Sequence, residues 1–415
     1  MIANLRNGKT LRTKLREWSR DSTMIVYGVL LIAAILFPPI STFATGSSAL
    51  IGLVADAGVW VLLAIGLNVV VGFAGLLDLG YAAFFAIGAY TYALFASYQL
   101  GATPLHHAVH LPFWLLLFGA MFVAATAGAI LGAPTLRLRG DYLAIVTLGF
   151  GEIVPRVFRN LRDWTNGADG IGGIDQPTLP VCIDGPWSQG DSLAIHFGPV
   201  NCSFSITDPS AYYVLMVLML IVCVILVTNL QTSRLGRAWA AVREDEVAAA
   251  AMGVNTRNIK LLAFGIGAAF SGFAGAYYGA KISLVSPDNF DFTVSITVLV
   301  MVVLGGMGNI PGVIIGALAV YFLEFKFLTD LPRNIQALID SIGLGPLLDN
   351  ANPATGWPGI QDFTQRLNYL VLGSILVLMM LLRPQGILPS RVRAQELKAE
   401  GSQDDSVFDQ QAGQT

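Results

Sequence analysis

Residues 293–327 read TVSITVLVMVVLGGMGNIPGVIIGALAVYFLEFKF, an apolar stretch that glycine, asparagine and proline interrupt between Gly305 and Pro311. A helix needs about 20 mainly apolar residues to cross the hydrocarbon core of a membrane. The half before the interruption is shorter than that, and short, glycine-interrupted helices often line transport pathways. Two interpretations stay open for Gly305, Gly306 and Gly308: a broken helix beside a substrate path, or a simple tight turn. In both, the stretch forms two helices.

The composition of the whole chain agrees with a membrane protein. Of the 415 residues, 54% are hydrophobic and 12% are charged, against roughly 25% charged in soluble domains. The net charge of -3 gives no reason to expect a nucleic-acid partner. The three cysteines and four histidines lack the spacing of metal ligands. We therefore predict no metal site.

Hydropathy predicts an all-α polytopic membrane protein with about ten transmembrane helices. The predicted spans are Met24–Pro39, Ala49–Val71, Gly80–Tyr98, Pro112–Ala133, Asp141–Phe158, Tyr212–Leu230, Ile259–Ala280, Thr293–Leu304, Gly312–Phe327 and Leu367–Leu382.

Basic residues gather in four clusters beside these spans. The clusters are the segment 1–23, the turn with Arg137 and Arg139, the loop with Arg234, Arg237 and Arg243, and the tail with Arg383, Arg391 and Arg393. Lys and Arg that flank spans are retained on the cytoplasmic side. If the spans alternate from a cytoplasmic N-terminus, all four clusters lie inside, so we expect both termini in the cytoplasm.

The domain organisation follows from this orientation. We predict a basic cytoplasmic segment at 1–23, a transmembrane domain at 24–388 and a polar, disordered cytoplasmic tail at 389–415. Inside the transmembrane domain, 159–211 forms a periplasmic loop and 231–258 a cytoplasmic loop. The chain is thus expected to be a multi-pass protein of the plasma membrane.

The predicted periplasmic loop contains Cys182 and Cys202. Two cysteines in an oxidising compartment can form a disulfide, and this pairing is left open. Arg156, Arg159 and Arg162 at the start of the loop run against the distribution of the other basic residues. They are candidates for contact with a periplasmic partner.

Ionisable and amide groups inside apolar spans are costly and are candidates for a substrate path. Asn68, Asp78 and Glu152 are the candidates, together with the three glycines already named. Asp56, Asp78 and Glu324 lie near span ends, where their carboxylates can reach the interface. Glu152 lies deeper, but Arg156 at i+4 offers it an ion-pair partner. A path-lining role and a structural ion pair therefore both remain open for Glu152.

The most specific element is the loop SRLGRAWAAVREDEVAAAAMGV at 233–254. Its Ala and Glu content predicts a helix, and Gly253 stands where a C-cap glycine belongs. Such a helix on the cytoplasmic side is either an interfacial anchor or a knob for a groove on a partner. The acids Glu244, Asp245 and Glu246 disfavour anionic lipid, so we favour the partner.

These motifs resemble the LivM-type permease subunits of bacterial branched-chain amino acid ABC importers. The resemblance runs from about Ala49 to Leu388. It rests on LRLRGDYLAIVTLGFGE at 136–152, NGADGIG at 166–172, the loop at 233–254, VLGGMGNIPG at 303–312 and RPQGIL at 383–388.

The resemblance implies a permease subunit without its own ATPase site and without a bound cofactor. Its implied partners are a second, LivH-type permease, two cytoplasmic ABC ATPase subunits that hydrolyse ATP, and a periplasmic substrate-binding protein. The family's coupling pattern of Glu-Ala-Ala followed by glycine falls on Val247, Ala248, Ala249 and Gly253, with the acid one place earlier at Glu246. The implied ATPase-coupling residues are Arg237, Arg243, Glu244, Asp245, Glu246, Ala248, Ala249 and Gly253.

The expected function is import of Leu, Ile and Val across the membrane by alternating access. Sparse intramembrane charge suits urea or a short amide equally well, and the urea-type permeases resemble this family. An ion-coupled secondary transporter is a third hypothesis, although it would need several intramembrane acids where only Glu152 stands out. No nucleophile with a nearby base lies inside a predicted span, so we do not expect an enzyme.

Overall fold

A computed structural model describes residues 26–43, 48–103, 110–135, 141–177, 181–184, 194–197, 209–330, 333, 370, 373–374, 377–378, 381 and 386–388. The chain forms two compact units. Unit 1 comprises Met1–Asp56 and Thr178–Met219, and unit 2 comprises Ala57–Pro177 and Leu220–Thr415.

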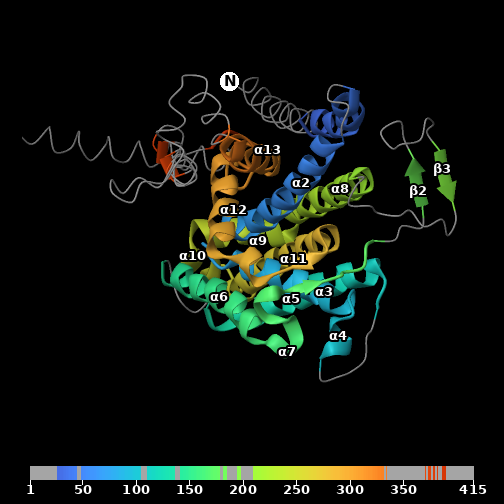
Figure 1. The fold of residues 1–415 in the computed structure, drawn as a ribbon. Coiled ribbons are helices and arrows are strands. Elements are labelled where there is room, and N and C mark those ends of the chain that lie inside the picture. The colour runs from blue at the N-terminus through green and yellow to red at the C-terminus, as the bar shows by residue number, and fades with distance from the viewer. Residues whose placement is uncertain are drawn as a thin grey trace, which may run out of the picture. The chain divides into compact units, whose positions relative to one another are not determined.

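Helices dominate the described part of the chain (Figure 1). They are an apolar helix at Val26–Phe43, α2 (Ala49–Asn68) continuing as the π-helix η1 (Val69–Phe73), α3 (Tyr81–Phe95), α4 (Gln99–Ala102), α5 (Phe113–Thr135), α6 (Asp141–Asn160), α7 (Arg162–Thr165), η2 (Gly167–Asp169), α8 (Ser210–Thr232), α9 (Arg234–Glu244), α10 (Glu246–Ala251), α11 (Thr256–Ile282), η3 (Pro287–Phe290), α12 (Phe292–Gly305), α13 (Ile310–Tyr321) and the π-helix η4 (Phe322–Leu328).

Seven helices in the described part of the chain are long and apolar enough to cross a membrane. The sequence predicted about ten spans, and three of those are not among these seven helices. Helix α3 is apolar but only 15 residues long. Helix α6 forms where expected, but Glu152, Arg156 and Arg159 lower its hydropathy. Most of the predicted Leu367–Leu382 span, and the predicted terminal segments 1–23 and 389–415, lie outside the described residues.

Unit 1 packs the Val26–Phe43 helix against the first part of α8. The hydroxyl of Tyr213 donates to the Ala34 carbonyl at 2.7 Å, and its ring lies 6.2 Å from that of Phe37. Ile51 and Ala55 from α2 complete this apolar core.

In unit 2, α11 packs along both α3 and α5 (Figure 1). Glycines bring the helix backbones together: a Cβ on Gly275 would lie 2.5 Å from the Phe85 carbonyl oxygen, and one on Gly128 would lie 2.6 Å from the Ala268 Cβ. In lipid, helices associate through such close packing rather than through hydrophobic contrast. Gly275 and Gly128 therefore permit the close packing of α3, α5 and α11.

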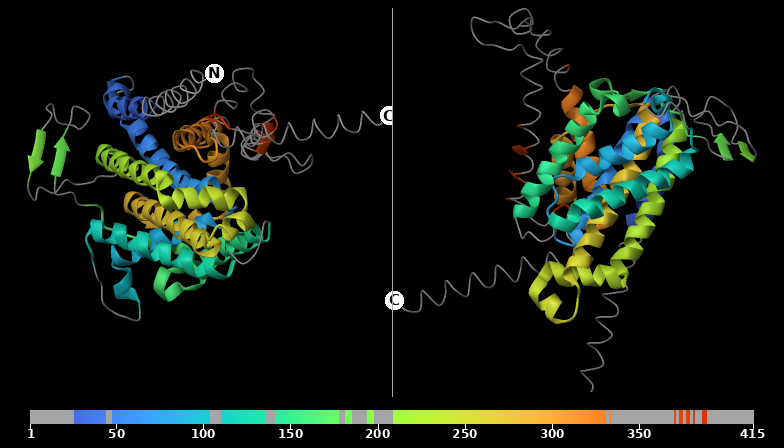
Figure 2. Two further views of the ribbon diagram at one scale, coloured as in Figure 1. Left: turned by 180° about the vertical axis from the view of Figure 1, so that it is seen from behind. Right: turned by 90° about the horizontal axis from the view of Figure 1, so that it is seen from below.

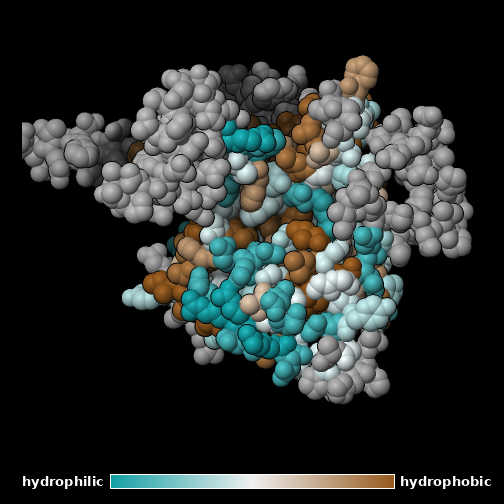
Figure 3. All heavy atoms as spheres, in the orientation of Figure 1, coloured by the Kyte–Doolittle hydropathy of each residue, from teal (hydrophilic) through white to brown (hydrophobic). Residues whose placement is uncertain are grey.

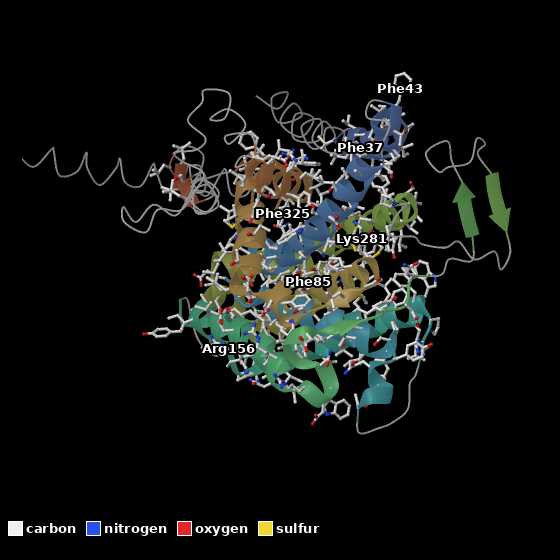
Figure 4. All side chains as sticks on the ribbon, viewed as in Figure 1. Phe37, Phe43, Phe85, Arg156, Lys281 and Phe325 are labelled. Carbon is white, nitrogen blue, oxygen red and sulfur yellow. The ribbon has the colours of Figure 1, made fainter. Side chains whose placement is uncertain are left out.

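Aromatic rings fill the space between α3 and its neighbours. Phe85 lies among the helices of this unit (Figure 4), with its ring 5.2 Å from that of Tyr278 and 5.1 Å from that of Phe290. Tyr90 stacks on Phe158 of α6 at 4.1 Å. This cluster connects α3, α6, α11 and η3.

The stretch 293–327 forms two helices, as predicted. Helices α12 and α13 are joined by a tight loop in which Gly306 and Gly308 have φ of 110° and 82°. A Cβ on Gly316 would lie 2.5 Å from Gly305 Cα, so only glycine permits this approach. The α13 helix continues into η4 and not as regular α-helix to Phe327.

Four short strands among the described residues accompany the predicted helices. Strand β1 (Ile171–Gly172) pairs antiparallel with β4 (Leu284–Val285) in unit 2, and β2 (Val181–Asp184) pairs antiparallel with β3 (Ala194–Phe197) in unit 1. Cys182 stands opposite His196 in the second pair. Cys202 lies outside the described residues, so the structure does not decide between paired and free Cys182 and Cys202.

We expect Gly275→Val to destabilise unit 2, because its branched side chain would overlap the backbone of α3. Overpacking of this kind costs about 1–3 kcal/mol. Thermal unfolding in detergent, followed by size-exclusion chromatography, measures the loss. Gly119→Val is the matched control, since a Cβ at Gly119 meets nothing within 4 Å; equal melting temperatures for the two variants would contradict the prediction.

Candidate coupling site and substrate path

The candidate coupling site begins at α9, whose start is fixed by Ser233. The Ser233 hydroxyl accepts hydrogen bonds from the backbone N–H groups of Leu235 and Gly236 at 3.1 and 3.3 Å. A side-chain oxygen at this position satisfies N–H groups that have no partner inside the helix.

The inner face of α9 is held by Trp239. Its side chain is fully buried, and its indole N–H donates to the Ile259 carbonyl at 2.8 Å. Gly236 and Val242 are buried on the same face. Helix α9 is therefore attached firmly to the start of α11.

The single helix predicted for this loop is wrong, because Asp245 divides it in two. Asp245 has an extended backbone with φ of -153°, and its carboxylate accepts from the N–H groups of Val247 and Ala248 at 2.8 and 3.0 Å. Asp is one of the strongest N-cap residues, so it ends α9 and starts α10. The sequence contained this signal, but the alanine-rich run concealed it.

The predicted stop at Gly253 is confirmed. Gly253 has φ of 86°; its N–H donates to the Ala250 carbonyl, and the Val254 N–H donates to the Ala249 carbonyl. Together these are the two bonds of a Schellman motif. Figure 2 shows α9 and α10, in yellow, turning at the end of the helices of unit 2.

Several predicted coupling residues face the protein rather than the surface. Glu246 forms a 2.5 Å ion pair with Lys260, whose residue is only 8% exposed. Arg243 donates to the Gly72 carbonyl at 2.6 Å. Arg237, in contrast, is exposed, although it donates to the Thr232 carbonyl at 2.9 Å. Ala249 is buried.

The exposed part of the loop contains two apolar side chains, of which the family pattern reached the first and the sequence prediction missed the second. Val247 is 68% exposed and Met252 is 85% exposed. Glu244, Ala248 and Gly253, which were predicted, are exposed beside them. The signal in the sequence that could have indicated them was an apolar residue at each end of an alanine run. We call Val247, Ala248, Ala251 and Met252 the α10 surface.

Two of the predicted path residues meet each other. Asn68 is fully buried at the end of α2, and its Oδ1 accepts from the Gly308 N–H at 2.8 Å. Its Nδ2 has no hydrogen-bond partner in the described structure. Asn68 directly precedes the π-helix η1, and π-bulges are frequent at functional sites. Gly305 ends α12, and Gly306 precedes Gly308 in the loop between α12 and α13.

Asp78 lies in the connection between η1 and α3 and is almost fully buried. Its Oδ1 accepts from the Gly80 N–H at 2.9 Å, and its Oδ2 has no hydrogen-bond partner in the described structure. Burial raises the pKa of Asp78 from 3.8 to about 7, although hydrogen bonds from Gly80 and Thr147 oppose this shift. The carboxylate therefore does not sit at a hydrated interface.

The remaining acids lie elsewhere. Glu152 pairs with Arg156 at 3.0 Å, in the arrangement expected of a structural ion pair. Asp56 is partly buried in α2. Glu324 lies in η4, and its Oε2 has no hydrogen-bond partner among the described residues.

The surface over α6 and α7 is hydrophilic (Figure 3). Arg156 lies on α6, at the edge of the helices of unit 2 (Figure 4). Arg159 forms an ion pair with Asp288 of η3. Nearby, Leu161 and Trp164 expose apolar side chains.

Comparisons with known proteins agree with this architecture. The family model described as "Branched-chain amino acid transport system / permease component" matches residues 49–380. The high-affinity branched-chain amino acid transport system permease protein LivM of Escherichia coli strain K12 is 41% identical over 338 residues, covering 80% of this chain and 68% of that protein. The Salmonella typhimurium LivM protein gives the same identity and coverage.

More distant relatives cover a similar share of the chain. The Salmonella typhimurium permease protein LivH is 25% identical over 333 residues, covering 79% of this chain and 91% of that protein. A probable LivM permease of Methanocaldococcus jannaschii is 25% identical over 285 residues, with 66% and 69% covered. No solved structure matches the chain.

The fold and these matches define a multi-pass membrane permease component, a transport protein rather than an enzyme. The chain belongs to the family of branched-chain amino acid transport system permease components, and within it resembles the LivM-type members.

The buried Asp78 predicts a pH-dependent stability. Its pKa is higher in the folded protein than in the unfolded chain, so ionisation opposes folding, and this contribution to stability falls as pH rises from about 4 to about 7. We expect Asp78→Asn to flatten the melting temperature over this range, because the amide keeps the acceptor for Gly80 without the charge.

Differential scanning fluorimetry in detergent, over the range in which the wild-type protein stays monodisperse, measures this effect. Glu152→Gln is the control, because the paired Glu152 is partly exposed. An identical pH dependence in wild type and Asp78→Asn would contradict the assignment.

Proposed function

We propose that this chain is one of the two membrane subunits of an ATP-driven importer that carries leucine, isoleucine and valine across the plasma membrane. The observation that carries the proposal is the α9–α10 loop, which presents apolar side chains from a firmly held support. The names of the relatives supply the substrate class, since they are described as high-affinity branched-chain amino acid permeases.

The proposed topology places both termini and 231–258 in the cytoplasm, and 159–211 in the periplasm. It has about ten crossings. These include α3, which is short, and α6, which contains charged residues. The distribution of Lys and Arg supports this orientation. The exposed arginines at the end of α6 would then face the periplasm, where a substrate-binding protein can approach.

We propose that the α10 surface docks in a groove on a cytoplasmic ATPase subunit. Its four members are small or apolar, and the acid Glu244 and the base Arg257 are exposed near its two ends in sequence. A short helix with exposed apolar anchors fits the helix-in-groove mode of recognition. Burial of Val247 and Met252 would supply most of the attraction, because exposed apolar side chains gain most from leaving water.

The complete transporter would contain this chain, a LivH-type permease, two ABC ATPases and a periplasmic binding protein. ATP would be hydrolysed by the partner subunits, and this chain would bind no cofactor. Closure of the ATPases would displace α9 and α10, and the membrane helices would alternate between outward and inward access. Asn68, Asp78 and the loop at Gly305–Gly308 are the proposed path residues, and the pairing of Glu152 with Arg156 favours a structural role for that acid.

Replacing both apolar anchors, as Val247→Glu and Met252→Glu, should weaken ATPase binding by about tenfold or more, since central apolar anchors contribute the most to interfaces. Co-purification of the ATPases with tagged permease from detergent measures the change. Leu161→Glu, an exposed apolar residue after α6, is the control. Wild-type levels of co-purified ATPase in the double variant would contradict the docking proposal.

Proteoliposomes that hold the complete transporter test the substrate and the energy source. We expect uptake of radiolabelled leucine that requires both ATP and the binding protein. Uptake of urea in preference to leucine would favour the urea-type alternative. Uptake by the purified chain alone, driven by an ion gradient, would overturn the ATP-driven function.

A further inference from the structure

Two side chains from different helices hold the backbone of Gly308, in the loop between α12 and α13. The Gly308 N–H donates to Asn68 Oδ1 at 2.8 Å, and the Gly308 carbonyl accepts from Gln231 Nε2 at 3.2 Å. Asn68 ends α2, and Gln231 lies near the end of α8. Both backbone polar groups of this glycine are therefore satisfied by side chains rather than by a helix.

A third side chain binds the π-helix η1 (Val69–Phe73), which follows Asn68 and is called the π-turn below. The guanidinium of Arg243 donates to the Gly72 carbonyl at 2.6 Å. Carbonyls in the last turn of a helix have no partner within it, and a cation there is favoured by the helix dipole. The turn packs closely, because a Cβ on Gly75 would lie 2.8 Å from Arg243 Cγ.

The π-turn and the Gly308 loop also touch directly. A Cβ on Gly72 would lie 2.6 Å from the Gly308 nitrogen and 2.9 Å from Asn68 Cγ. Gly72, Asn68 and Gly308 therefore form one tightly packed junction. A change in the position of any of them displaces the other two.

Both ends of α9 connect to this junction. Gln231 precedes the α9 N-cap Ser233 by two residues, and Arg243 is the penultimate residue of α9. The contacts therefore form a closed ring that runs from Gln231 to Gly308, Asn68, Gly72 and Arg243, and back through α9. All members of the ring belong to unit 2.

The amide of Asn68 is not explained by stability alone. Its Nδ2 is buried and has no hydrogen-bond partner in the described structure, and an unsatisfied buried donor costs free energy. An apolar side chain would avoid the cost of the unpaired donor, but it could not accept a hydrogen bond from the Gly308 N–H. Asn68 therefore keeps the hydrogen bond from Gly308 to its Oδ1, while its Nδ2 stays without a partner in the described structure.

We propose that Asn68, Gln231 and Arg243 are positioning residues that join α9 to the loop between α12 and α13, so that a displacement of α9 moves the helix breaks at Gly72 and Gly308. This linkage rests on the proposed docking of an ATPase on the α9–α10 loop. It identifies specific hydrogen bonds that carry the displacement from that loop to the predicted substrate path.

The test measures leucine taken up per ATP hydrolysed in proteoliposomes that hold the complete transporter. This ratio is not changed by a difference in the amount of ATPase bound. We expect Arg243→Ala and Asn68→Leu each to lower the ratio about fivefold or more, the lower range of coupling between two sites. Arg243→Lys should restore part of it, because the cation at the end of the helix remains.

Two further variants sharpen the result. Arg234→Ala changes an exposed arginine at the start of α9 whose side chain is not one of the three that form the linkage, and it should leave the ratio at the wild-type value. The double variant of Arg243→Ala with Asn68→Leu should lose no more than the more severe single variant, because residues in one linkage are not additive.

A wild-type ratio in both single variants, or fully additive losses in the double variant, would overturn the linkage. If Asn68→Leu does not assemble, the exposed Gln231 decides: a lowered ratio in Gln231→Ala supports the linkage, and an unchanged ratio overturns it. Failure of the proposed function has a different signature, since the wild-type transporter itself would then show no ATP-dependent leucine uptake.

Discussion

The structure depends on one constraint: backbone N–H and C=O groups that leave a helix inside an apolar bundle need a partner other than water. Each break near the candidate path is satisfied by a particular side chain. Arg243 binds the Gly72 carbonyl, and Asn68 binds the Gly308 N–H. These polar side chains allow the helices to be discontinuous without exposing bare backbone.

The same constraint attaches the C-terminal segment 386–388 to the bundle. The N–H groups of Ile387 and Leu388 donate to the carbonyls of Leu304 and Gly305 at the end of α12, at 2.8 and 3.2 Å. Asn309 Nδ2 donates to the Leu388 carbonyl at 2.8 Å. The loop between α12 and α13 is thus held by the C-terminal segment as well as by Asn68 and Gln231. Segments from α2, α8 and the C-terminal part of the chain therefore meet at this loop.

Close packing surrounds the contacts that we propose to link α9 to the loop between α12 and α13. Glycine at 72, 75 and 308 permits backbones and side chains to approach where a Cβ would collide or where φ is positive. Such contacts leave little room for one element to move without its neighbour. Rigid connections of this kind would carry a displacement of α9, where we propose that an ATPase docks, to the loop between α12 and α13.

The sequence by itself determined the class of fold, most helix positions, the break at 305–311 and the C-cap at Gly253. These features depend on local properties, namely long apolar runs and the backbone freedom of glycine. The tertiary structure alone decided that Arg243 and Glu246 face inward, whereas Val247 and Met252 are exposed. It also decided that Asn68 meets Gly308, 240 positions later in the chain. Local patterns cannot reveal such pairings, because they arise from which helices pack together, and in an apolar bundle nearly every face looks equally suitable for packing.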